Sequence, residues 1–241
     1  MKIHNFPQGS TAWHRVRCGI PTASNFDKFI TAKTLTLADN ETSRNYRAKL
    51  LAEWLLGEPV NDDYVNQYMT RGTLEEENAR KEYAFVHEVE VVEVGFVESD
   101  GVGCSPDGLV GDDGMIEVKT KGIIQHVRCM LQDDSCHMLQ VQGNLGITGR
   151  EWCDRIYYNP RLRTVTRRIE RDDKMIVKIN DAVVEFWRYS AADRVACLAA
   201  GDKPAPPFDA SHYDEYGEPI PPADDAERLQ AKFDRKESVT A

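Results

Sequence analysis

The hydrophobic pattern of this chain changes period near residue 88, and this change restricts the fold more than any other feature. Before it, residues 9–17, 22–31, 42–56 and 62–87 are predicted to be helices, with apolar side chains at helical spacing. From Glu88 to Glu98, polar and apolar residues nearly alternate, which is typical of a strand. A chain that combines both periods predicts a mixed α/β domain.

The rest of the chain continues this alternation of strands and helices. The further predicted elements are strands Val102–Ser105 and Met115–Lys119, helices 123–132 and 135–147, strands Glu151–Tyr158 and Arg163–Glu170, and a helix over about 172–200. The expected fold class is α/β, with a central mixed β-sheet flanked by helices. Thr22 is the expected cap of the second helix, and Thr42 or Ser43 that of the third, because hydroxyls can accept the free amides of a helix start.

The last forty residues differ from the rest in charge and in proline content. Residues 202–241 contain ten acidic and five basic side chains, so they supply −5 of the formal net charge of −10, and six prolines interrupt any regular element. We therefore expect one domain over 1–201 and an acidic, proline-rich C-terminal tail over 202–241, with a short helix near Asp224–Lys236. The tail is either solvated or an arm that packs on a neighbouring subunit.

The composition is that of a globular protein without a membrane segment. Hydrophobic residues make up 41% of the chain and charged residues 29%, which excludes wholesale disorder. No apolar run approaches the roughly 18 residues that span a bilayer, and the first residues lack the apolar core of a signal peptide. The six cysteines are therefore expected to be reduced thiols in a cytoplasmic protein.

Net charge alone argues against a nucleic-acid partner, but its distribution does not. Proteins that bind nucleic acids usually carry a patch of basic residues, whereas the formal net charge of this chain is −10. Between Arg155 and Arg171, however, six arginines occur in seventeen residues, with Glu170 as the one acid. These arginines are either phosphate contacts along one face of a strand, or a face that is solvated or salt-bridged between subunits.

The most informative pattern is Pro106-Asp107 followed by Glu117-Val118-Lys119. Residues two apart in a strand share a face, so Glu117 and Lys119 project together, and hairpin pairing can bring Asp107 beside Glu117. Two carboxylates suit Mg²⁺ or Mn²⁺, and the Val118 carbonyl can add a ligand. Lys119 can orient or deprotonate a water, or stabilise charge on a phosphoryl group. The alternative is a solvent-exposed Glu–Lys pair.

Two predicted helices carry side chains that can complete such a site. Glu76 belongs to an acidic run and lies close to the inward face, so it either reaches an interior metal or belongs to a solvated face. Gln140 and Asn144 lie one helical turn apart. Their amides either hold a water or a phosphate, or they are polar surface.

The segment from Trp13 to Ser24 has the composition of a phosphate pocket. Arg17 precedes a loop, and Thr22 and Ser24 begin the next predicted helix. A helix N-terminus with hydroxyls and a nearby arginine is well suited to phosphate. The alternative is ordinary helix capping beside a surface arginine.

In this order, these segments resemble the bacteriophage lambda-type exonucleases, the YqaJ-like viral recombinase family within the PD-(D/E)xK nuclease superfamily. The resemblance covers roughly residues 10–190. The residues that carry it are Trp13-His14-x-x-Arg17-x-Gly19-Ile20-x-Thr22-Ala23-Ser24, Gly72-x-x-x-Glu76-x-x-Ala79-Arg80, Cys104-Ser105-Pro106-Asp107-Gly108-Leu109, Glu117-Val118-Lys119, Gln140-Val141-Gln142 and Tyr157-Tyr158-x-Pro160-Arg161.

The resemblance implies a restriction-endonuclease-like core and a processive 5′→3′ exonuclease that needs Mg²⁺, for which Mn²⁺ substitutes. It implies linear double-stranded DNA with a 5′-phosphate as substrate and 3′ single-stranded overhangs as product. It further implies a homotrimeric ring around the duplex, a single-strand annealing protein as partner in phage-type recombination, and a place in the cytoplasm of a bacterial host cell.

The resemblance also implies a role for individual residues. The implied catalytic and metal-binding groups are Asp107, Glu117, the Val118 carbonyl and Glu76 for the metal, Lys119 for the attacking water, and Gln140 for that water or the scissile phosphate. The implied DNA contacts are Arg17, Ser24 and Ser105 for the 5′-phosphate, and Thr22, Trp13 and Arg161 elsewhere on the DNA.

One segment departs from the family pattern, and two other functions stay open. After Lys119, residues 120–125 lack the proline and the later arginine that relatives often carry, and Lys121 or Arg128 are the candidates to replace them. The alternatives are a PD-(D/E)xK endonuclease acting on duplex or branched DNA, and a DNA-binding or assembly module with a degenerate site.

Overall fold

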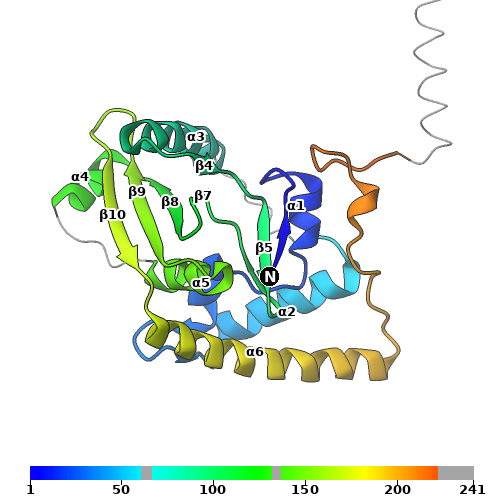
Figure 1. The fold of residues 1–241 in the computed structure, drawn as a ribbon. Coiled ribbons are helices and arrows are strands. Elements are labelled where there is room, and N and C mark those ends of the chain that lie inside the picture. The colour runs from blue at the N-terminus through cyan, green and yellow to red at the C-terminus, as the bar shows by residue number, and fades with distance from the viewer. Residues whose placement is uncertain (61–66, 132–136, 222–241) are drawn as a thin grey trace, which may run out of the picture.

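A five-stranded mixed sheet, on the left in Figure 1, forms the framework of one half of the molecule. The computed structural model describes residues 1–60, 67–131 and 137–221. The sheet has the order β10-β9-β8-β7-β4, and only β8 and β9 run parallel. Its strands are β4 (Val91–Val92), β7 (Gly108–Val110), β8 (Gly114–Thr120), β9 (Trp152–Tyr158) and β10 (Val165–Glu170).

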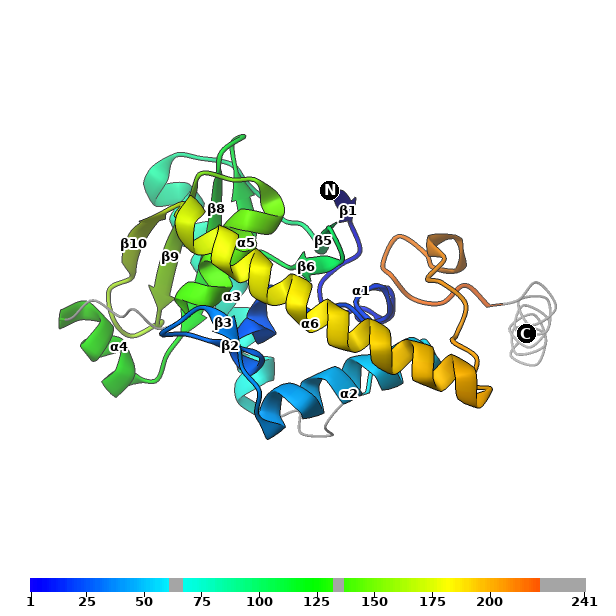
Figure 2. The ribbon, with the colours of Figure 1, turned by 90° about the horizontal axis from the view of Figure 1, so that it is seen from below.

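Helices cover both faces of this sheet. On one face, Ala79 and Tyr83 of α3 (Gln67–His87) pack against Ile116 and Ile156. On the other face, α5 (Met138–Thr148) and α6 (Asp173–Ala200) contribute to the larger core, and α4 (Ile123–Leu131) contacts β9. Figure 2 shows α6 crossing the length of the molecule beneath this core. The expected α/β class, a central mixed sheet flanked by helices, is therefore confirmed.

A second, smaller sheet joins the N-terminal segment to the middle of the chain. It has the order β1-β5-β6, with β1 (Lys2–His4), β5 (Phe96–Ser99) and β6 (Val102–Cys104). Thr22 forms an isolated bridge with Gly103, which ties the N-terminal helical region to β6. The remaining elements of this half are α1 (Thr11–Val16), the 3-10 helix η1 (Ala23–Lys28), β2 (Ile30–Thr31), β3 (Thr36–Leu37) and α2 (Glu41–Leu56).

The predicted single strand over 88–98 is wrong, because the chain changes sheets within it. β4 belongs to the central sheet and β5 to the smaller one. Between them, a Cβ placed on Gly95 would lie 2.1 Å from the Phe6 carbonyl oxygen and 2.5 Å from that of His4. Only glycine lets the two backbones approach this closely. The Glu-Val alternation continues across the junction, so the pattern alone does not show the break.

Other element boundaries also differ from the sequence prediction. β7 was absent from the predicted elements, and the cap of α2 is Asn40, whose side chain accepts from the Ser43 amide, rather than Thr42 or Ser43. Thr22 precedes η1, a 3-10 helix, without a side-chain capping bond. The first residues of the helix predicted over 62–87, and residues 132–136 between α4 and α5, lie outside the described residues.

The described part of the C-terminal segment lies against the start of the chain. The Gly217 carbonyl accepts from the Ala12 amide at 2.8 Å, and the Glu218 carboxylate accepts from the Thr11 hydroxyl at 2.8 Å. Phe6 contacts the rings of Phe208 and Tyr213. The helix predicted near 224–236 lies outside the described residues, and the division at 201/202 stays a prediction. No helix among the described residues is long and apolar enough to cross a membrane.

Candidate active site

The β7–β8 hairpin brings the first two carboxylates together. Its register pairs Gly108 with Ile116, so Asp107, directly before β7, lies across from Glu117. The Asp107 Oδ2 atom accepts a hydrogen bond from the Val118 amide at 2.5 Å. A Cβ on Gly108 would lie 2.3 Å from Val91 Cγ1, so the close packing of β7 on β4 requires glycine here.

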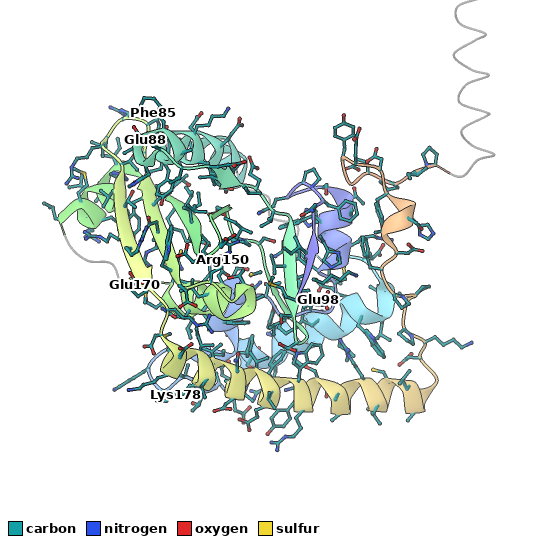
Figure 3. The ribbon with its side chains drawn as sticks, viewed as in Figure 1. Phe85, Glu88, Glu98, Arg150, Glu170 and Lys178 are labelled. Atoms are coloured by element: carbon teal, nitrogen blue, oxygen red, sulfur yellow. The ribbon has the colours of Figure 1, made fainter. Side chains whose placement is uncertain are left out.

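An arginine from the far end of the site fixes the same hairpin. Arg150, labelled in Figure 3, donates to the carbonyl oxygens of Val110, Gly111 and Gly114 at 3.3, 2.7 and 2.7 Å. These three carbonyls belong to the turn between β7 and β8. Their shared donor holds the turn and therefore the register that places Asp107.

Glu117 is the centre of a buried hydrogen-bond network. Its carboxylate is 3% exposed, and Oε1 accepts from Lys119 Nζ at 2.8 Å and from Gln140 Nε2 at 2.7 Å. Lys119 Nζ also donates to Gln140 Oε1 at 3.0 Å. Asn144 Nδ2 donates to the other carboxylate oxygen, Oε2, at 3.1 Å. The alternative of a solvent-exposed Glu–Lys pair does not hold, since both side chains are largely buried.

The electrostatics of the site are those of crowded acids. Burial raises the pKa of Asp107 well above its usual range, and the charges of Glu117 and Glu76 raise it further. Burial likewise raises the pKa of Glu76, although Arg80, which donates to its Oε1 at 2.7 Å, lowers it in part. Glu76 is thus half-buried and within the field of Glu117, rather than on a purely solvated face.

Lys119 is held in its charged form. Burial alone would lower its pKa, but the attraction of Glu117 and the hydrogen bond to it outweigh that effect, and the pKa of Lys119 is raised. An ammonium group donates hydrogen bonds and accepts none. In this arrangement Lys119 can therefore orient a water or a phosphoryl oxygen, and it is not poised to remove a proton.

The acids fit a divalent cation, although they do not enclose one as they stand. Among the described residues, no three His, Cys, Asp or Glu side chains form a metal-binding cluster. Glu76 is bonded to Arg80, and Glu117 to Lys119 and two amides. The oxygen-only donor set suits Mg²⁺ or Mn²⁺, and a cation would offset the repulsion that raises the pKa of Asp107 and Glu76. The Val118 carbonyl stays a predicted ligand.

Two residues of the predicted phosphate pocket meet at an indole ring. Arg17 Cζ lies 3.8 Å from the centroid of the Trp13 ring, and Trp13 Nε1 donates to Ser105 Oγ at 3.0 Å. Burial lowers the pKa of Arg17 to about 10. Its Nε has no hydrogen-bond partner among the described residues. A guanidinium with a free, buried donor, on the indole ring that also bonds a serine hydroxyl, is suited to an anion.

Ser24 and Thr22 form a separate hydroxyl pair. The two Oγ atoms lie 3.2 Å apart, and Asn25 Nδ2 donates to Thr22 Oγ1 at 2.8 Å. The bridge between Thr22 and Gly103 places this pair near the strand that leads to Ser105. No hydrogen bond within the described part of the chain joins Ser24 to Arg17 or Ser105.

The arginines of 155–171 do not form a single basic face. Arg155 is 2% exposed and lies directly across from Glu117 on the parallel strand. Arg168 pairs with Asp154 and Arg171 with Asp173. Arg161, the predicted DNA contact of this stretch, is exposed and lines a cavity with Asn159 and residues 122–125.

Sequence reasoning missed two residues beside Glu117. Asn144 was expected, with Gln140, either to hold a water or a phosphate or to be polar surface, and not to bond Glu117. Its spacing from Gln140 is the signal that could have assigned it to that contact. Arg155 had no such local signal, because its place beside Glu117 depends on the parallel pairing of β8 and β9.

The chain is similar to a known domain family and to several solved structures. Residues 12–151 match the YqaJ-like viral recombinase domain. The chain is similar to the crystal structure of an alkaline exonuclease, LHK-Exo, from Laribacter hongkongensis, with 32% identity and a TM-score of 0.69 over 78% of this chain and 96% of that one. A structure of LHK-Exo in complex with dAMP gives the same identity and TM-score, over 78% and 97% of the two chains.

A more distant structure supports the fold alone. A phage-related exonuclease from Haemophilus somnus 129PT shares 17% identity and a TM-score of 0.59, over 75% of this chain and 96% of that one. No curated protein matches the sequence at a significant level. The expected restriction-endonuclease-like core of the PD-(D/E)xK type is confirmed by these neighbours.

Proposed function

Because the chain belongs to the YqaJ-like viral recombinase family, we propose that it is a divalent-metal-dependent exonuclease that degrades one strand of linear double-stranded DNA from the 5′ end. The proposed product is a duplex with 3′ single-stranded overhangs, the substrate of recombination by strand annealing. LHK-Exo binds dAMP, and a nucleoside 5′-monophosphate is what stepwise removal from a 5′ end releases.

One observation carries the proposal: the candidate phosphate pocket and the candidate catalytic acids share one chain segment. Ser105 accepts from the indole of Trp13, over whose ring Arg17 lies, and it is two residues from Asp107. Two residues span at most about 7 Å. An anion held at Ser105 and Arg17 therefore lies beside the acids, which favours cleavage next to a phosphorylated end over cleavage within a duplex.

Each residue near the acids has a role in this proposal. Mg²⁺, or Mn²⁺ in its place, held by Asp107, Glu117, Glu76 and the Val118 carbonyl would polarise the scissile phosphate and lower the pKa of a water. Lys119, held charged by Glu117, donates to that water or to a phosphate oxygen. Gln140 bonds both Lys119 and Glu117, so it fixes the distance between them.

The substrate's terminal phosphate is assigned to the pocket at the Trp13 ring. Arg17 supplies the charge and Ser105 a hydroxyl, with Ser24 as the third contact. Trp13, Thr22 and Arg161 are the proposed further contacts with DNA. A strand without a 5′-phosphate would leave the Arg17 guanidinium buried without its counter-charge, so such ends would bind more weakly.

The proposal includes an assembly and a partner, both taken from the family resemblance. A homotrimeric ring with head-to-tail interfaces would enclose the duplex and make degradation processive. A single-strand annealing protein would receive the overhang. Light scattering tests the ring, since three subunits of 27.3 kDa give a mass of about 82 kDa and a monomer would contradict the threading of DNA.

A cleavage assay on defined ends tests the activity. With Mg²⁺ we expect 5′-phosphorylated linear duplex to release mononucleotides, 5′-hydroxyl duplex to react more slowly, and covalently closed circles to remain intact. Lys119→Ala should lower the rate by about 10³-fold, while Lys178→Ala, an exposed lysine on α6, should not. Nicks in closed circles would instead support the endonuclease, and full activity in excess EDTA would exclude the metal mechanism.

A further inference from the structure

Asn144 donates a hydrogen bond to Oε2 of Glu117, whereas Lys119 and Gln140 both bond the other oxygen, Oε1. Its Nδ2 atom donates to Glu117 Oε2 at 3.1 Å, and the side chain is 2% exposed. Gln140, one turn earlier on α5, donates to Oε1 at 2.7 Å. Two amides on one helix face therefore hold the two oxygens of one carboxylate, and this double contact fixes the plane of that carboxylate.

The hydrogen bonds that the described residues make to Glu117 leave one acceptor position on its carboxylate. A carboxylate has about four lone-pair positions, two on each oxygen. Lys119 and Gln140 fill both positions on Oε1, and Asn144 fills one on Oε2. The remaining position is on Oε2, so the orientation that Asn144 imposes decides where the free lone pair of Glu117 points.

The side-chain amide of Asn144 is suited to orienting the Glu117 carboxylate. Its amide nitrogen must face Glu117, because its carbonyl oxygen would repel a carboxylate. The backbone carbonyl of Asn144 accepts from the Thr148 hydroxyl at 2.8 Å, which belongs to the helix rather than to the site. A leucine of similar size would fill the same space but would leave Oε2 without its donor.

We propose that Asn144 is a positioning residue that sets the divalent-cation affinity of the site by fixing the orientation of the Glu117 carboxylate through its Oε2 atom. The inference rests on the cation site of the proposed function. Residues that orient a metal ligand through a hydrogen bond commonly change metal affinity by about 10–100-fold when they are replaced. Asn144 acts through Glu117 and does not itself contact the cation.

The test is metal binding without DNA and without catalysis. Mn²⁺ is titrated into the full chain, and free Mn²⁺ is measured by its electron paramagnetic resonance signal. The variants are Asn144→Leu and Asn144→Ala, and the matched control is Thr148→Val, which removes a hydroxyl from the same helix one turn further on. Circular dichroism in EDTA establishes that each variant is folded.

We expect both Asn144 variants to bind Mn²⁺ about tenfold or more weakly and Thr148→Val to bind it like the unmodified chain. In cleavage assays the half-saturating Mg²⁺ concentration should rise, with most of the maximal rate recovered at high Mg²⁺. Unchanged Mn²⁺ affinity in either folded variant would overturn the proposal. So would unfolding of both variants beside a folded Thr148→Val, because Asn144 would then support the helix and not the cation site.

The outcome can be separated from that of the proposed function. If the unmodified chain binds Mn²⁺ and the Asn144 variants bind it more weakly, the inference stands even where no exonuclease activity is found. If the unmodified chain cleaves DNA but its Mn²⁺ affinity does not depend on Asn144, the proposed function stands and the inference fails.

Discussion

The two faces of strands β8 and β9 each bury a carboxylate, and the two carboxylates are treated in opposite ways. On the α3 face, Asp154 is 3% exposed and accepts from Tyr83 at 2.6 Å and from Arg168 at 2.7 and 2.8 Å. Burial alone would raise the pKa of Asp154, but these bonds outweigh it and the pKa is lowered. Asp154 is therefore a buried carboxylate whose charge is stabilised by hydrogen bonds from neighbouring residues of the fold.

Around Glu117, on the other face of β8, several acids lie within one another's field instead. Asp107 and Glu76 have raised pKa values. Burial is the largest cause of the shift in the pKa of Asp107, and the charge of Glu117 is the next largest. A cluster of this kind costs stability in the isolated chain and is relieved by a cation. The difference indicates that a buried acid whose cationic partner outweighs its burial supports the fold, whereas acids that also raise one another's pKa support a function.

The contrast between Asp154 and the site acids is tested most strongly by the cleavage rate of the Asp107→Asn variant. We expect a rate reduction of roughly 10³-fold, because the amide has no charge to offer a cation. The same change should leave the urea midpoint in EDTA unchanged or higher, since it removes charge repulsion from Glu117 and Glu76. The exposed Asp100→Asn serves as the control. A strongly destabilised Asp107→Asn would show that this acid is structural after all.

The opposite outcome is expected for Asp154→Asn. It should lower the free energy of unfolding by about 2 kcal/mol, because charged hydrogen bonds to Arg168 and Tyr83 are weakened, while cleavage at saturating Mg²⁺ stays close to that of the unmodified chain. Urea denaturation and the cleavage assay measure the two quantities. Loss of cleavage without loss of stability would reverse the roles of the two faces.

The stability lost in Asp154→Asn should depend on pH with a defined sign. The folded-state pKa of Asp154 is lowered, so its contribution is fully present above the unfolded pKa of about 3.9 and is lost as the pH falls through the folded value. Urea midpoints should therefore differ by a constant amount from pH 5 to 8. Below about pH 4, the difference in urea midpoint between the unmodified chain and Asp154→Asn should shrink. A difference that grew toward acid pH would contradict the assignment.

The smallest effect is expected for Tyr83→Phe. This change removes one hydrogen bond to Asp154 and keeps the two from Arg168, so the free energy of unfolding should fall by only about 1 kcal/mol. Tyr83 and Glu76 lie two turns apart on one face of α3. Differential scanning calorimetry measures the loss, and a loss equal to that of Asp154→Asn would mean that Tyr83, not Arg168, is the main partner of Asp154.

The sequence by itself determined the parts of the site that depend on local spacing. Glu117 and Lys119 share a face because residues two apart in any strand do so, and Gln140 and Asn144 share one because they lie a helical turn apart. The period change near residue 88 likewise determined the α/β class. These features follow from backbone geometry within a few residues, so they are visible without the fold.

Only the tertiary structure decided which of these local pairs meet. The parallel pairing of β8 and β9 places Arg155 beside Glu117 and Asp154 on the opposite face, and the packing of α5 brings both amides to Glu117. The break at Gly95 sends one alternating segment into two sheets. Such contacts join residues far apart in the chain, and no repeating pattern along the sequence encodes which distant strand or helix will be the neighbour.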